Sequence, residues 1–83
     1  MNRGSLYKNM GQHEKEALKD YNRAIWLEPN YPLTYNKRGS LYETLGEQKK
    51  ALNDYNYAIQ LEPNFAIAIK NRDALLEQMK LKL

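Results

Sequence analysis

The chain has 83 residues, which is room for one small domain with a thin hydrophobic core. It contains no cysteine and one histidine, His13, which excludes disulfides and the usual Cys/His zinc sites, and we expect no metal or other cofactor. The net charge of +3 is modest, and 42% of the residues are hydrophobic, too many for a disordered chain. Valine is absent and other β-branched residues are few, so the composition predicts an all-α fold.

The first residues after Met1 contain no apolar run of the kind that a secretory signal needs. Nor does the chain contain an uninterrupted apolar stretch long enough for a membrane span. We therefore expect a cytoplasmic protein with no membrane partner.

An internal repeat organises the chain. Residues 17–30 (ALKDYNRAIWLEPN) recur 34 positions later as residues 51–64 (ALNDYNYAIQLEPN), and residues 3–7 (RGSLY) recur 35 positions later as residues 38–42. The two offsets differ because the inner turn of the first unit carries one extra residue. Each unit therefore reads as a pair of helices joined by a short turn.

We predict helices over residues 2–10, 14–28, 32–45, 48–61 and 65–81. Gly11 and Gly46 should end the first helix of each unit, because glycine adopts the left-handed conformation that closes a helix. Pro29 and Pro63 should end the second helices, because proline disfavours helical geometry in the residue before it. The predicted divisions are repeat one at 1–31, repeat two at 32–65 and a capping helix at 66–83.

The last helix carries its own apolar pattern. One packing face is predicted from residues spaced by four and three: Phe65, Ile69, Arg72, Leu76, Met79 and Leu83. Asp73 replaces the glycine found at Gly4 and Gly39 of the two units. We therefore expect a terminal helix that covers the open end of the stack.

The repeat resembles the tetratricopeptide repeat (TPR) family. The middle unit matches the family pattern at six positions and has Arg38 where leucine is usual: Tyr35, Gly39, Tyr42, Ala51, Tyr55 and Pro63. The first unit matches it at Gly4, Tyr7, Ala17, Tyr21 and Pro29. The resemblance implies a right-handed α-solenoid of two helix-turn-helix hairpins plus a C-terminal capping helix. It also implies a protein-interaction module with a scaffold or adaptor role.

Ligands of this family usually lie along a concave surface formed by the first helix of each unit. We call the corresponding set here the first-helix face, and its members are Asn2, Ser5, Asn9, Leu33, Asn36, Lys37, Ser40, Glu43, Thr44, Lys70 and Asn71. Asparagine can donate to and accept from a peptide backbone, and lysine can hold a carboxylate. The hypothesis is a groove for an extended, acidic peptide, and the alternative is a solvated polar surface.

Some family members grip the terminal carboxylate of chaperone tails with two lysines, two asparagines and an arginine. This chain matches that clamp poorly, because Met1 and Ser5 fall where a lysine and an asparagine should be. If the clamp is placed one unit earlier, Leu33 still stands where a lysine is required.

Trp26 is conspicuous because its repeat equivalent is Gln60, so the repeat itself does not require an aromatic residue there. It is either an interface anchor or a residue that packs against Tyr31 and Pro32.

Other functions find less support. His13 lies in the inner turn beside Glu14 and Glu16, with no nucleophile placed next to it, so we predict no enzyme. The pI of about 9.2 suggests an RNA-binding repeat, but the lysines are scattered over the helices without a continuous basic stripe, which argues against nucleic acid.

The chain holds about two and a half repeat periods, whereas repeat proteins of this kind need about three for stability. We therefore expect either a piece of a longer array or a homo-oligomer that completes its core by self-association.

Overall fold

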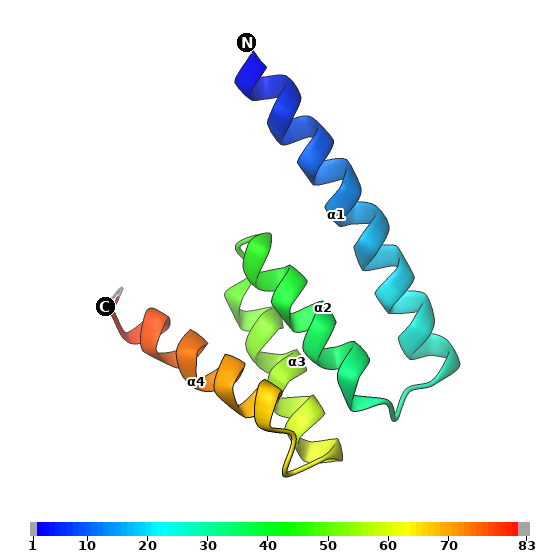
Figure 1. Cartoon of the computed structure of the whole chain (residues 1–83), viewed down its shortest axis with the longest axis vertical. Helices are drawn as coiled ribbons and strands as arrows, with labels where there is room; N and C mark the ends of the chain where they lie inside the picture. The colour runs from blue at the N-terminus through cyan, green and yellow to red at the C-terminus, as the bar shows by residue number, and fades with distance from the viewer. Residues whose placement is uncertain (1, 82–83) are drawn as a thin grey trace.

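The computed structural model describes the backbone of residues 2–81 and the side chains of residues 11–81. All regular structure in this range is helical: α1 spans Asn2–Leu27, α2 Pro32–Thr44, α3 Gln48–Leu61 and α4 Ala66–Leu81. The predicted all-α class is confirmed, and the last three helices match their predicted ranges to within one residue. Within the described part, α1 packs against α2 alone, and α3 packs against both α2 and α4 (Figure 1).

Helices α2 and α3 form the predicted helix-turn-helix hairpin. Gly46 has a φ of +81°, its N–H donates to the Glu43 carbonyl, and the Glu47 N–H donates to the Tyr42 carbonyl. This pair of bonds satisfies the last carbonyls of α2 and reverses the chain direction. Gly46 therefore acts as the sequence predicts.

The core of this hairpin depends on a close approach at Gly39. A Cβ atom added there would lie 2.8 Å from Cε1 of Tyr55 and 3.2 Å from the Ala51 carbonyl oxygen. Tyr55 and Ala51 are fully buried and form one core cluster with Leu75 of α4. Glycine is required at residue 39 because the tyrosine ring occupies the space that a side chain would need.

A second cluster joins α3 to α4 near the other end of the hairpin. It contains Tyr35, Ala58 and Ala68, with Ile25 of α1 and Phe65 packed against it. Ala58 is fully buried and packs in one cluster with Ala68 of α4. The core therefore lies mainly between α2, α3 and α4.

The first unit departs from its prediction. Residues 2–10 and 14–28 are not two helices, because α1 runs without a break from Asn2 to Leu27 and its N-terminal half projects past the end of α2 (Figure 1). The predicted turn at Gly11 is wrong: Gly46 is the glycine with positive φ in the described range. Glycine inside a helix costs only about 0.5–1 kcal/mol, and residues 12–16 are ordinary helix formers, so the helix continues.

Helix α4 uses a different packing face from the one predicted. Leu75 is fully buried, whereas its neighbour Leu76, placed in the predicted face, is 41% exposed. Ile69, Arg72 and Met79 are half-buried as expected, and Leu83 lies outside the described residues. The face is rotated because the buried contacts are made by Ala68 and Leu75, which are seven residues apart on one side of the helix.

None of the helices within residues 2–81 combines the length and the apolar character that crossing a membrane requires.

Candidate interaction surface

The first-helix face is formed in the described structure by α2 and α4. The two helices are joined where the side-chain N–H of Asn71 donates to the Asn36 carbonyl oxygen at 3.1 Å. This bond sets two first helices of successive units side by side. The pairing of residues 36 and 71 could have been anticipated from their shared face but not from the repeat, since they are not equivalent positions.

Four polar members of the face are exposed: Lys37, Ser40 and Thr44 on α2 and Lys70 on α4. Lys37 and Lys70 each follow or precede one member of the amide pair in sequence, on the two helices that the pair joins. Ile67, one turn before Lys70, is 56% exposed and adds apolar surface.

Other members of the predicted face have structural partners. Asn36 is buried, and its side-chain carbonyl oxygen accepts the hydrogen bond from Asn71 that joins α2 to α4, while its role toward a ligand stays a prediction. The Thr44 hydroxyl donates to the Ser40 carbonyl at 3.3 Å, and Glu43, half-buried like Leu33, accepts a hydrogen bond from the Tyr55 hydroxyl. The predicted residues Asn2, Ser5 and Asn9 fall outside the residues whose side chains the structure describes.

Tyr55 is held neutral by its surroundings. Burial, followed by the hydrogen bond to Glu43, raises the pKa of its hydroxyl. The protonated hydroxyl therefore stays a donor to Glu43 across the α2–α3 hairpin.

Sequence reasoning missed a polar cluster at Arg38. Its Nε and Nη2 donate to the two carboxylate oxygens of Asp54, each at 2.7 Å, and its Nη1 donates to Oδ1 of Asn22 at 3.0 Å. The guanidinium also lies 5.7 Å from the ring centroid of Tyr35 and 5.6 Å from that of Tyr42. Arg38 thus ties α1, α2 and α3 together, and the hydrogen bonds to Asp54 raise its pKa.

A signal for this cluster was present in the sequence. Arg3 and Arg38 are repeat equivalents, and so are Asp20 and Asp54. A charge pair that recurs in both units indicates an interaction within the repeat, here between its two helices.

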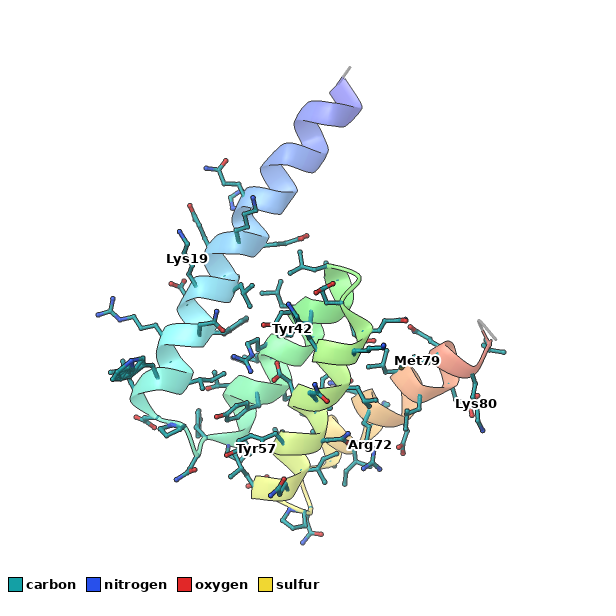
Figure 2. The ribbon with its side chains drawn as sticks, turned by 180° about the vertical axis from the view of Figure 1, so that it is seen from behind. Lys19, Tyr42, Tyr57, Arg72, Met79 and Lys80 are labelled. Atoms are coloured by element: carbon teal, nitrogen blue, oxygen red, sulfur yellow. The ribbon has the colours of Figure 1, made fainter. Side chains whose placement is uncertain are left out.

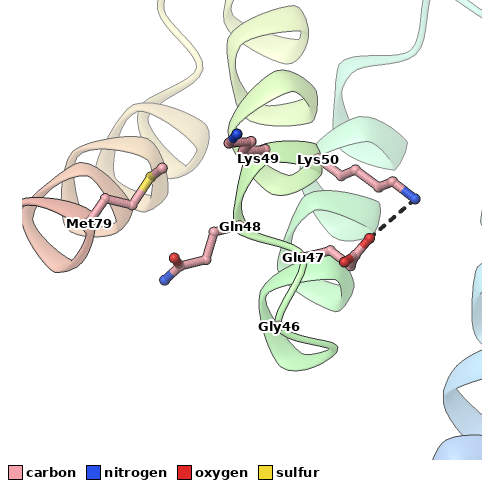
Figure 3. Close-up of a pocket in the computed structure, with 6 residues that line it drawn as sticks. All are labelled: Gly46, Glu47, Gln48, Lys49, Lys50 and Met79. Atoms are coloured by element: carbon pink, nitrogen blue, oxygen red, sulfur yellow. Dashed lines mark ion pairs between the residues drawn. The ribbon is translucent and has the colours of Figure 1, made fainter. Parts of the chain in front are cut away.

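Two pockets of the described surface lie away from the first-helix face. One of about 430 Å³ is lined by the α2–α3 turn and Met79 of α4, where Lys50 pairs with Glu47 at 3.2 Å (Figure 3). Another of about 280 Å³ is lined by Leu27, Tyr31 and Thr34, among others.

Trp26 is 75% exposed, so any packing against the connector covers at most a quarter of it. Leu27 and Tyr31 beside it are also exposed. The three side chains form an apolar area at the junction of α1 and α2.

The exposed lysines are dispersed. Lys19 on α1 and Lys80 near the end of α4 lie at opposite sides of the molecule (Figure 2). The described surface thus agrees with the scattered pattern read from the sequence.

Comparison with known proteins identifies the class. A family profile described as "TPR repeat" matches residues 4–46, just over half of the chain, and one described as "Tetratricopeptide repeat" matches residues 32–65. The chain belongs to the tetratricopeptide repeat family, whose repeats generally mediate protein–protein interaction.

A human protein, "Tetratricopeptide repeat protein 6", is 46% identical over 41 residues. The match covers 49% of this chain and 8% of the human protein, so the chain spans a small part of that relative.

Proposed function

We propose that the protein binds an extended, acidic peptide segment of a partner protein on the first-helix face. The observation that carries this proposal is the exposure of Lys37, Ser40 and Lys70 on the two helices that the Asn36–Asn71 bond joins. The bond connects α2 to α4 and orients the side-chain amide of Asn71 before a ligand arrives. Such preorganisation lowers the entropy lost on binding.

The chemistry of the face suits a peptide backbone. Asn71 uses one N–H on Asn36, which leaves its carbonyl oxygen and second N–H for a ligand, and its side chain is half-buried rather than enclosed. An extended peptide offers both a carbonyl and an N–H at each residue, so one amide side chain can satisfy both. Ile67 provides an apolar contact beside it.

Charge determines which peptides are favoured. Lys37 and Lys70 supply two exposed positive charges, and the Glu43 carboxylate accepts a hydrogen bond from the Tyr55 hydroxyl. An ion pair between an exposed ammonium group and a peptide carboxylate contributes about 0.2–1 kcal/mol, and a glutamate in place of the lysine would repel the same carboxylate. Aspartate and glutamate in the peptide are therefore selected over neutral residues. A scaffold or adaptor role would follow from holding such a segment.

The test is a selection of peptides from a random library on the immobilised 83-residue chain. We expect enrichment of Asp and Glu, and we expect an enriched synthetic peptide to bind the double variant Lys37→Glu/Lys70→Glu at least about tenfold more weakly, equivalent to about 1.4 kcal/mol.

The matched control is Lys19→Glu/Lys49→Glu, which makes the same change in net charge at exposed lysines outside the face. It should bind the peptide like the unmodified chain at moderate salt, where distant charges are screened. Equal weakening by both double variants, or none by either, would refute the assignment of the face.

A further inference from the structure

The C-terminal half of α1 corresponds in the repeat to α3, but no first helix packs against it in the way that α2 packs against α3. Its residues Ala17 and Tyr21 are repeat equivalents of Ala51 and Tyr55, which are fully buried under α2, yet both are only half-buried. The difference in burial is larger for the equivalent carboxylates. Asp54 is 5% exposed and pairs with Arg38, whereas Asp20 is exposed.

The sequence that would cover this side of α1 is present in the chain. Residues 3–7 are identical to residues 38–42, the part of α2 that covers α3. The segment supplies a glycine, Gly4, for the position where Tyr55 needs one, and an arginine, Arg3, for the position that pairs with Asp54. The TPR profile match that starts at residue 4 gives independent support that this segment has the sequence of a first helix.

This segment cannot cover its own chain while α1 is continuous. At 1.5 Å of rise per residue, Arg3 lies about 25 Å along the same helix from Asp20. The two are therefore held apart by the helix that contains both.

Helix α4 is a poor substitute for the segment. It is the other first helix without a following partner, and its Arg72 is equivalent to Arg38. It carries Asp73 at the glycine position, however. At the equivalent Gly39, even an added Cβ atom would lie 2.8 Å from the ring of Tyr55, so an aspartate would not fit against the tyrosine ring.

We propose that the uncovered side of α1, formed by Ala17, Asp20 and Tyr21, is the seat for residues 2–10 of a second copy of this chain. The two copies exchange these segments reciprocally across their straight α1 helices. Arg3 of each copy pairs with Asp20 of the other, as Arg38 pairs with Asp54 within one chain. Exchange of an identical element uses the contacts of the closed repeat and needs no new surface.

The inner turn controls the exchange. In the second unit the segment GEQKK (residues 46–50) holds the turn and the start of α3. The corresponding segment of α1 is GQHEKE (residues 11–16), which is one residue longer and helical throughout. Shortening it to the sequence of the second unit should let residues 2–10 fold back on their own chain.

The first experiment measures mass by light scattering across a concentration series, followed by charge reversal. We expect the unmodified chain to reach twice the 9.8 kDa of one copy, and Arg3→Asp and Asp20→Arg to be monomeric when measured separately. An equimolar mixture of the two variants should dimerise. In a mixed pair one seat keeps the natural Arg3–Asp20 pair, and the other seat joins the two substituted side chains, which again carry opposite charges.

Mixing distinguishes exchange from folding back, since within one chain neither variant gains a partner from the other. Replacing residues 11–16 by GEQKK should give a monomer with the helical content retained. The proposal is overturned if the unmodified chain is monomeric throughout the series, if the single variants still dimerise, if their mixture does not, or if the shortened chain still dimerises. The experiment leaves Lys37 and Lys70 untouched, so its outcome is independent of the peptide proposal.

Discussion

Arg38 has the largest role of any single polar residue in the described structure. It connects three helices through Asp54, Asn22 and two tyrosine rings, at a position where the family pattern usually has leucine. A buried carboxylate such as Asp54 needs a paired cation, because burying an unpaired charge costs several kcal/mol. Arginine suits this site since its fork matches both carboxylate oxygens at once.

Replacing Arg38 by methionine should therefore destabilise the protein by about 3 kcal/mol, because it leaves Asp54 without its partner. The equivalent change Arg72→Met should cost less than about 1 kcal/mol, since Arg72 pairs with the exposed Asp73 at 3.2 Å. Urea unfolding followed by circular dichroism measures both free energies of unfolding. A similar decrease in the free energy of unfolding for the two variants would show that the buried Arg38–Asp54 pair contributes no more than a surface pair.

At the scale of the element, the segments at Gly11 and Gly46 show what local sequence decides and what it leaves open. Both contain glycine followed by polar helix formers, a pattern that predicts a turn. Gly46 forms one with positive φ, whereas Gly11 lies inside α1. Local preference favours neither state strongly at Gly11, because the penalty for glycine in a helix is only about 1 kcal/mol.

Alanine substitution should separate the two glycines. Gly46→Ala should cost about 1–2 kcal/mol, because a Cβ atom is strained at its positive φ. Gly11→Ala should stabilise by about 0.5–1 kcal/mol, because alanine favours the helix and the added Cβ would meet no atom within 4 Å. Thermal unfolding at one fixed chain concentration checks both signs. A destabilised Gly11→Ala variant would indicate that the chain needs a turn there.

Across the whole molecule, the helices form a stack in which stability comes from contacts between neighbours. Helix α3 is covered on both sides, α4 on one side, and α1 touches only α2 among the described residues. In such arrays each interface contributes separately, so a weakened interface loosens the element at the end first.

Leu75 tests this arrangement because it is the fully buried residue that joins α4 to Tyr55 and Ala51. Leu75→Ala should cost about 2–5 kcal/mol and should raise amide hydrogen exchange in α4 before exchange rises in α2 and α3. Leu76→Ala, at the adjacent exposed position, should cost less than about 1 kcal/mol. A larger loss of stability for Leu76→Ala than for Leu75→Ala would instead support the packing face predicted from the residue spacing.

The sequence by itself determined the helical class, the family and the positions of α2, α3 and α4. These follow from features that act locally or repeat along the chain: the 34-residue period, Pro29 and Pro63 at the helix ends, and Gly39, whose missing side chain leaves space for Tyr55.

Only the tertiary structure decided which polar side chains are buried in hydrogen bonds within the protein and which are exposed. Asn36 and Asn71 look alike in sequence, yet one is buried against the other because α2 and α4 meet at that point. Leu75 rather than Leu76 enters the core for a similar reason. The rotation of α4 is set by its contacts with Ala51 and Tyr55 of α3. The straight α1 is different, because its N-terminal half projects past α2 and the helix formers after Gly11 outweigh the small cost of glycine in a helix.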